Sequence, residues 1–251
     1  MTRLQPIDED IWLCEGPVVA FYTLPYPTRM VVVRLDDGSL WIWSPIALDD
    51  ELKTEIEGLG SPAHLVSPNK LHHLAMGEWA AAFPGVRLWA LPALMKKRRD
   101  LHFETLGDEA PEAWRGEIDQ VVFRGSPMME ETVFFHRRSR TAIFADLIEN
   151  FSDEFLASQK GWHGWRTRLA HLCKITEPDG MAPLEWRFSW LDRDLGRQAL
   201  ATVMSWAPEK VVIAHGTWAD HDGQVFIARG FRWLRQVALS EGVGPCCSRP
   251  F

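Results

Sequence analysis

Four residues that can hold a metal ion lie at or shortly after the ends of predicted strands: His72, His73, Asp146 and His215. The strands concerned are the apolar runs AHLV at 63–66, RTAIFA at 140–145 and KVVIA at 210–214. In open α/β folds, sites form beyond the carboxyl ends of strands, so residues far apart in the sequence converge there. Three imidazoles and a carboxylate match the ligands that zinc, iron and manganese accept. The spacing therefore predicts a metal site made by these four side chains.

A purely structural interpretation of the same residues is also open. Nine histidines in a chain of 251 residues will often include one adjacent pair by chance. In that case His72 and His73 begin a helix, and Asp146 caps another.

The predicted elements must position these residues. Strand-like runs separated by turns occupy 11–22, 28–35 and 40–46, which indicates an antiparallel start. Helical periodicity then predicts helices at 48–59, 72–83 and 92–99, with strands at 63–66 and 86–91 between them. Further strands are predicted at 120–123, 132–137 and 140–145, the last two as a hairpin. This order is typical of an α/β fold.

A long segment at 147–208 interrupts the α/β order. Its amphipathic stretches predict a mostly helical insertion with one short strand at 186–190. The chain then returns to a strand at 210–214, and 224–235 closes the fold. We expect a single domain over residues 1–240, followed by a flexible tail at 241–251 that is rich in Gly, Pro, Ser and Cys.

The composition restricts the partners of the protein. Because 27 Lys and Arg oppose 34 Asp and Glu, the net charge is −7, which argues against a nucleic-acid partner. No run approaches the roughly 18 consecutive apolar residues of a membrane span, and the first ten residues are too polar for a secretory signal. We therefore expect a soluble, cytoplasmic protein that acts on a small molecule and has no membrane partner. The four cysteines lack paired metal-ligand spacing and are expected to be reduced.

The segments around the predicted ligands resemble those of the metallo-β-lactamase superfamily of metal-dependent hydrolases. The typical motif there is Thr-His-x-His-x-Asp-His-x-x-Gly after a strand. The segment from Ser67 to Gly77 fits this motif with one more residue before the glycine, and His73 matches its last histidine. The segments that end at Asp146 and His215 look like the strands that carry the bridging aspartate and the last histidine of the superfamily.

The departures from the motif fall on one of the superfamily's two metal sites. Pro68 and Lys70 stand where the first two histidines would be, and the region 126–131 lacks the isolated third histidine. The second site keeps a counterpart at every position: His72, in place of the aspartate, with His73, Asp146 and His215. The resemblance covers about residues 10–235 and implies an α/β fold, an αββα sandwich of the metallo-β-lactamase type, in a divergent and uncharacterised branch with a single metal.

A single divalent metal, zinc in the first place and iron or manganese as alternatives, would make the protein a hydrolase. Such a metal polarises a carbonyl or phosphoryl oxygen and lowers the pKa of its water to about 7. The expected reaction is attack of water on an ester, a lactone or a phosphodiester. Asp146 would bind the metal or act as a base, and His72, if outside the metal shell, would carry a proton. Lys70 would stabilise an oxyanion or a substrate carboxylate, unless it is a solvated loop lysine.

Other residues near these motifs have two interpretations each. Glu130 and Glu131 would add a carboxylate ligand or belong to an exposed hairpin approach. His221 would support His215 or lie in a turn. The insertion would cover the metal pocket, and its tryptophans would form an aromatic wall or simply pack its helices: Trp162, Trp165, Trp186, Trp190 and Trp206.

Two further functions fit the same sequence. The missing ligands are consistent with a catalytically inactive protein that keeps the metallo-β-lactamase fold for binding or as a scaffold. The remaining ligands would also suit an iron site for redox or oxygen chemistry. Bound metal and hydrolysis of generic esters separate these alternatives from the hydrolase.

Overall fold

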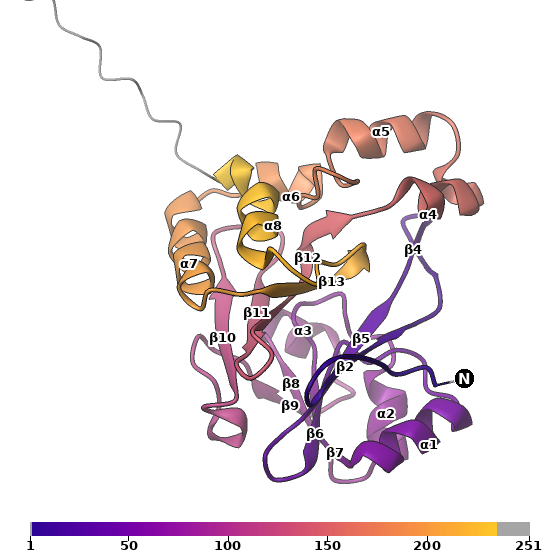
Figure 1. The fold of residues 1–251 in the computed structure, drawn as a ribbon, viewed down its shortest axis with the longest axis vertical. Coiled ribbons are helices and arrows are strands. Elements are labelled where there is room, and N and C mark those ends of the chain that lie inside the picture. Colours follow the sequence, from indigo (N-terminus) through magenta and orange to yellow (C-terminus); the bar gives the residue numbers. More distant parts are fainter. Residues whose placement is uncertain (1, 235–251) are drawn as a thin grey trace, which may run out of the picture.

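Two β-sheets form the frame of the structure, a computed structural model that describes residues 2–234 (Figure 1). The first sheet has the strand order β1-β2-β5-β6-β7-β8-β9, and the second has the order β10-β11-β12-β13. The strands of the first sheet are β1 (Gln5–Asp8), β2 (Ile11–Glu15), β5 (Arg29–Arg34), β6 (Ser39–Trp43), β7 (Ser61–Val66), β8 (Arg87–Ala90) and β9 (Phe103–Thr105). Those of the second are β10 (Ile118–Phe123), β11 (Glu131–His136), β12 (Thr141–Asn150) and β13 (Lys210–Gly216). A separate hairpin joins β3 (Val19–Phe21) to β4 (Leu24–Tyr26).

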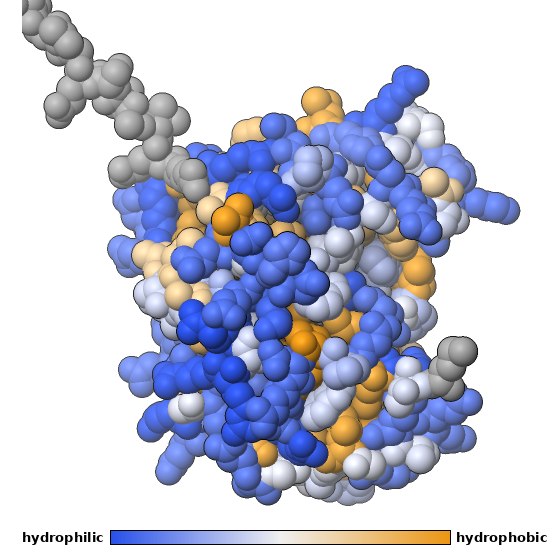
Figure 2. Space-filling model, in the orientation of Figure 1, coloured by the Kyte–Doolittle hydropathy of each residue, from blue (hydrophilic) through white to orange (hydrophobic). Residues whose placement is uncertain are grey.

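Strand alternation divides the apolar core into three layers. In β5, Val31 and Val33 contribute to the layer between the two sheets, while Met30 and Val32 belong to the layer beneath the helices of the first sheet. Strands β6, β12 and β13 alternate in the same way. Figure 2 shows that the face of the molecule turned to the viewer is mostly hydrophilic, with hydrophobic residues exposed in several separate places.

Helices cover the outer face of each sheet (Figure 1). The outer layer of the first sheet is completed by α1 (Asp50–Leu59), α2 (Met76–Ala82) and α3 (Pro92–Lys97). That of the second is completed by α7 (Arg193–Ser205) and α8 (Gly223–Gly230). Short 3-10 turns lie at Glu112–Trp114, Lys160–Trp162 and Arg232–Leu234. The layers are therefore helix, sheet, sheet, helix, as expected for the predicted fold class.

The segment predicted as a helical insertion is mostly helical, with two corrections. Strand β12 continues to Asn150, and the helices α4 (Asp153–Ser158), α5 (Trp165–Cys173) and α6 (Leu184–Phe188) follow before α7. The prediction of a strand at 186–190 is wrong, because α6 occupies the first part of this segment. Trp186 and Trp190 are four residues apart, the spacing of one side of a helical turn, and both are buried in the core. The predicted tail at 241–251 lies outside the described residues. Among residues 2–234, no helix has the length and apolar character needed to cross a bilayer.

Candidate metal centre

The loop at 67–75, between β7 and α2, holds His72 outside any helix. The Ser67 hydroxyl lies 2.8 Å from the Asn69 carbonyl oxygen and 2.7 Å from that of His72, and can donate to either. The Leu71 N–H donates to Asn69 Oδ1 over 2.8 Å. Such bonds between side chains and nearby backbone compete with helix formation. The helix predicted at 72–83 therefore begins only at Met76.

Asp146 lies inside β12 rather than at the end of the strand. At Asp146 the pairing of β12 with β13 is irregular. The regular parallel pairing of the two strands shifts between Phe144 and Glu149. The backbone N–H groups of Ala145 and Asp146 donate instead to the two carboxylate oxygens of Glu131, each over 2.8 Å. Because this fully buried side chain replaces a neighbouring strand as acceptor, it fixes the backbone that presents the Asp146 carboxylate.

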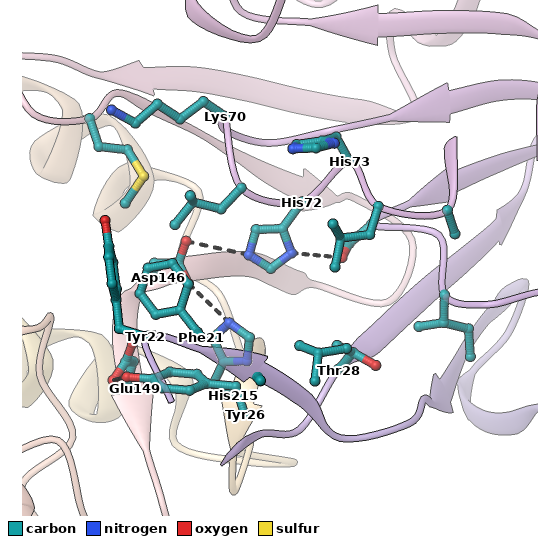
Figure 3. Close-up of a pocket in the computed structure, with 18 of the residues that line it drawn as sticks. Phe21, Tyr22, Tyr26, Thr28, Lys70, His72, His73, Asp146, Glu149 and His215 are labelled. Atoms are coloured by element: carbon teal, nitrogen blue, oxygen red, sulfur yellow. Dashed lines mark hydrogen bonds and ion pairs between the residues drawn. The ribbon is translucent and has the colours of Figure 1, made fainter. Parts of the chain in front are cut away.

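Three of the predicted ligands converge in the structure (Figure 3). Asp146 Oδ2 lies 3.3 Å from His72 Nε2, and Asp146 Oδ1 lies 3.0 Å from His215 Nε2. The ligand atoms of all three residues lie within 4.8 Å of one another. Asp146 and His215 come from neighbouring strands of the second sheet, whereas His72 comes from the loop that follows β7 of the first. The cluster therefore forms where the two sheets meet.

The other ring nitrogen of each imidazole is held by the protein. His215 Nδ1 lies 2.7 Å from the Pro27 carbonyl oxygen, which can only accept, so Nδ1 carries a hydrogen. His72 Nδ1 lies 2.8 Å from Ser44 Oγ, which can donate or accept. In a neutral His215 the Nε2 lone pair thus points at the Asp146 carboxylate. Metal-binding histidines are typically oriented through their second nitrogen in this way.

The donor set fits a divalent metal ion. A tetrahedral zinc ion about 2.0–2.1 Å from each ligand keeps the ligand atoms roughly 3.3 Å apart. The two imidazole nitrogens lie 3.3 and 3.0 Å from the two different oxygens of Asp146, and one ligand atom from each of the three residues lies within 4.8 Å of the others, so a shared metal requires only a small adjustment of the side chains. Without a cation, or a proton on Nε2, the lone pairs of His215 and Asp146 would face each other at 3.0 Å. Two imidazoles and one carboxylate are compatible with metal binding and leave further coordination positions open.

The charge of Asp146 is stabilised inside the protein. Burial alone would raise the pKa of Asp146, but His72 and His215 outweigh it and hold the pKa below its ordinary value. The Asn69 amide donates to Asp146 Oδ2 over 2.8 Å and to Glu131 Oε2 over 3.1 Å. Burial, followed by the charge of Asp146, raises the pKa of Glu131 to about 8. The two imidazoles thus favour the ionised form of Asp146, the form in which it can bind a metal.

His73, predicted as a fourth ligand, does not join the cluster. Its side chain lies apart from His72 in Figure 3, and its Nδ1 lies 3.1 Å from Nη1 of Arg98, which can only donate. Burial, with the charges of Lys97 and Arg98, lowers the pKa of His73 to about 4. The physical reason is the loop geometry, in which adjacent side chains diverge and the second imidazole is packed beside a guanidinium.

The remaining candidates occupy different surroundings. Lys70 lines the pocket, and its ammonium donates to the Met128 carbonyl. Glu130 is half-buried, with one carboxylate oxygen 3.7 Å from Nε of Arg124. His221 is exposed beside Asp220, so the turn interpretation applies. Of the two glutamates, only Glu131 reaches the site, where it supports Asp146 without entering the ligand cluster.

A cavity of about 530 Å³ opens beside the three clustered residues. Its wall includes apolar residues from the β3–β4 hairpin, the loop after β6, the loop after β7 and α6. Trp186 is the one insertion tryptophan that lines it; Trp162 and Trp190 are buried elsewhere, and Trp165 is 68% exposed. The insertion thus covers one side of the pocket, while most of its tryptophans do not face the cavity.

Several site residues were not identified from the sequence. Ser44 lies inside the strand predicted at 40–46, whereas in the structure it directly follows β6, so the strand-end rule that selected His72 could have found it only with the correct end of that strand. Asn69 lies within the motif, but its amide side chain is not one of the histidine and carboxylate ligands for which the sequence was searched. The Pro27 carbonyl has no sequence signal, and Glu149 lies in a segment predicted to be helical.

Comparisons with known proteins agree with the architecture. A sequence model of a family described as a domain of unknown function, DUF4336, matches residues 8–160. No curated protein matches the chain. A crystal structure of the DIM-1 metallo-β-lactamase exposed to ceftazidime superposes with a TM-score of 0.60 at 16% identity, over 92% of this chain and 94% of that one.

Two other solved structures give the same result. The metallo-β-lactamase from Hirschia baltica has a TM-score of 0.59 at 10% identity, over 93% of this chain and 97% of its own. That from Erythrobacter litoralis has a TM-score of 0.58 at 10% identity, over 92% and 91%. Identities this low establish the fold alone. The chain therefore belongs to the DUF4336 family and has the metallo-β-lactamase fold.

Proposed function

We propose that the protein is a metal-dependent hydrolase that holds one divalent metal through His72, Asp146 and His215. Zinc is the first expectation, and iron and manganese accept the same ligands. The observation that carries the proposal is the convergence of two Nε2 atoms on one carboxylate, with the Nδ1 atom of each imidazole already engaged by the protein. When bound, the metal supplies a Lewis acid and lowers the pKa of its water, which suits hydrolysis of an ester, a lactone or a phosphodiester.

The residues around the ligands would prepare the site for this chemistry. The Pro27 carbonyl fixes the hydrogen of His215 on Nδ1 and keeps Nε2 available. Asn69 and Glu131 hold Asp146 in its orientation. These contacts limit the rearrangement that metal binding requires.

Lys70 would stabilise negative charge on the substrate. An ammonium group has three N–H donors, and the Met128 carbonyl accepts one of them. Lys70 stands in the cavity wall, where a fixed positive charge favours a developing oxyanion or a carboxylate.

Hydrolysis measured on metal-loaded protein tests the proposal. The substrates are p-nitrophenyl acetate, bis(p-nitrophenyl) phosphate and a simple lactone, one for each class. We expect hydrolysis of at least one substrate, its loss on chelation and in His215→Ala, and its retention in His221→Ala, which changes an exposed histidine. Lys70→Ala should bind metal normally but have a lower kcat. If fully metal-loaded protein hydrolysed none of the three, a binding or scaffold role would replace the hydrolase.

A further inference from the structure

One side of the cavity combines a buried carboxyl group with aromatic rings. We define the acidic-aromatic corner as Phe21, Tyr26, Glu149 and Trp186, which all line the cavity. They come from the β3–β4 hairpin, the end of β12 and α6. Figure 3 shows Phe21, Tyr26 and Glu149 grouped near His215, with Lys70 drawn on the opposite side of the view.

Glu149 lacks the partners that a buried carboxyl group normally has. The residue is 2% exposed, and the one hydrogen bond of its carboxyl group comes from the Tyr26 hydroxyl over 3.4 Å, which is long for such a bond. The charged groups that act most strongly on it are acidic: Asp146, Glu185 and Glu131. A buried polar group left this way requires an explanation, and a ligand that enters the cavity supplies one.

The rings beside Glu149 narrow the chemistry of that ligand. Phe21 and Tyr26 meet edge to face with centroids 5.6 Å apart, and Trp186 is 2% exposed. Aromatic faces attract organic cations, and a carboxylate without a cation partner does so directly. Figure 3 shows Lys70 away from these rings, and Lys97 lies beside Lys70, because its ammonium donates to the Lys70 carbonyl over 3.2 Å. The corner is therefore suited to positive charge and unsuited to an anion.

We propose that the acidic-aromatic corner binds the ammonium group of an amine-bearing substrate, with Glu149 as its counter-ion. This inference deepens the proposed function, on which it rests for the reaction but not for the binding. The cavity of about 530 Å³ has the size of a small-molecule site. An ammonium group at Glu149 would leave the hydrolysable bond of the same molecule facing His72, Asp146 and His215.

Calorimetric titration with two simple probes tests the corner. The probes are hexylammonium and hexan-1-ol, which share one hexyl chain, and each is titrated into zinc-loaded protein and again in the presence of chelator. We expect hexylammonium to bind at least tenfold more tightly than hexan-1-ol in both conditions. Glu149→Gln should reduce that ratio to about twofold or less. Glu78→Gln, which makes the same change on an exposed residue in the cavity wall, should leave it unchanged.

A second variant guards against misfolding of Glu149→Gln, which circular dichroism would detect. Phe21→Leu keeps an apolar side chain but removes a ring, so hexylammonium should bind several-fold more weakly while hexan-1-ol is unaffected. Equal binding of amine and alcohol by the wild type would overturn the proposal. So would a folded Glu149→Gln variant that kept the full preference for the amine.

Paired ester substrates separate this proposal from the hydrolase itself. The pair is p-nitrophenyl 6-aminohexanoate and p-nitrophenyl hexanoate. Amine binding that depends on Glu149 but is accompanied by no hydrolysis of either ester supports the corner and contradicts the hydrolase. Hydrolysis of both esters at equal kcat/KM, with no amine preference in the titrations, contradicts the corner and leaves the hydrolase intact.

Discussion

Glu131 determines how Asp146 is presented to the two imidazoles. Its carboxylate accepts the N–H groups of Ala145 and Asp146 and the amide of Asn69, all inside the protein. A search of the sequence for metal-ligand residue types cannot find such a residue. The role of Glu131 is to accept hydrogen bonds from backbone N–H groups where the pairing of the strands is irregular. It was considered as a ligand because it is acidic, and the structure gives it a supporting position instead.

Replacing Glu131 should therefore cost stability. In Glu131→Ala three buried N–H donors lose their acceptor, which should lower the free energy of unfolding by about 3 kcal/mol or more. Urea denaturation measures the change. Glu130→Ala is the matched control, because Glu130 is only half-buried, and it should change the value by no more than about 0.5 kcal/mol. Equal effects of the two variants would contradict the assigned role of Glu131.

The difference between His72 and His73 shows a limit of sequence reasoning at the scale of residues. Both were predicted as ligands, and both follow the same strand. Only the backbone of the loop, set by the Ser67 and Asn69 side chains, decides that His72 faces Asp146 while His73 faces Arg98. Residue types and spacing identify the candidate ligands, but they do not predict the backbone conformation of the loop that separates the two side chains.

At the scale of elements, the close approach of β12 and β13 positions His215. Gly216 follows it with φ +100°, a conformation that favours glycine, and a Cβ atom there would lie 2.2 Å from the Asn150 carbonyl oxygen. The two strands run in parallel at this point, with Asn150 opposite Gly216. The glycine thus allows the strand to continue beyond the imidazole without displacing its neighbour.

Gly216→Ala should disturb both the strand and the site. The clash and the backbone strain should lower the free energy of unfolding by about 2 kcal/mol or more, and zinc affinity should fall as His215 shifts. Denaturation and zinc titration measure the two effects. Gly58→Ala is the control, because Gly58 lies in α1 with open space around its Cβ position, and it should raise stability by about 0.5–1 kcal/mol. A neutral Gly216→Ala would show that this close approach is not required.

The end of β11 should make folding sensitive to acid. Burial, with the charge of Arg138, lowers the pKa of His136 to about 4 from 6.5. Between these values the unfolded chain binds more protons than the folded one, so the contribution of His136 falls as the pH drops from 6.5 towards 4. At about 1.4 kcal/mol per pKa unit, this loss is on the order of 3 kcal/mol.

A variant without that titration provides the measurement. The difference in the free energy of unfolding between the wild type and His136→Gln should become smaller as the pH falls, because only the wild type has a buried imidazole that resists protonation. The comparison uses denaturation curves at several pH values between 4 and 8. Curves that stay parallel over this interval would contradict the assignment.

At the scale of the whole molecule, the candidate site joins the two sheets. His72 follows β7 in the first sheet, while Asp146 and His215 belong to the second. A metal held by all three would connect the sheets and bind the folded chain in preference to the unfolded one. Folding stability and metal binding should therefore be linked.

Zinc should stabilise the whole chain. At a free zinc concentration about 100 times the Kd, the free energy of unfolding should rise by about 2.7 kcal/mol. For a chain of this size that corresponds to an increase in Tm of roughly 5–10 °C. Thermal unfolding with zinc and with chelator measures the shift. It should be absent in His215→Ala, and an equal shift in that variant would indicate binding at another place.

Much of the overall architecture could be predicted because its signals are local. The strand-like apolar runs in 28–35 and 40–46 and the helical spacing in 48–59 agree with β5, β6 and α1. The strand predicted at 186–190 was wrong because Trp186 and Trp190 fit more than one pattern. The cavity and its buried Glu149 arise where the β3–β4 hairpin meets β12 and α6, a contact between distant segments that no local pattern describes.

The central claim is most directly tested by counting zinc bound to the wild type, His215→Ala and His73→Ala. Each protein is purified without chelator, equilibrated with a small excess of zinc, separated from free metal and subjected to elemental analysis. We expect one zinc per chain in the wild type and in His73→Ala, and none in His215→Ala. A wild type that binds no zinc, or a His215→Ala variant that retains it, would contradict the claim that His72, Asp146 and His215 form the metal site.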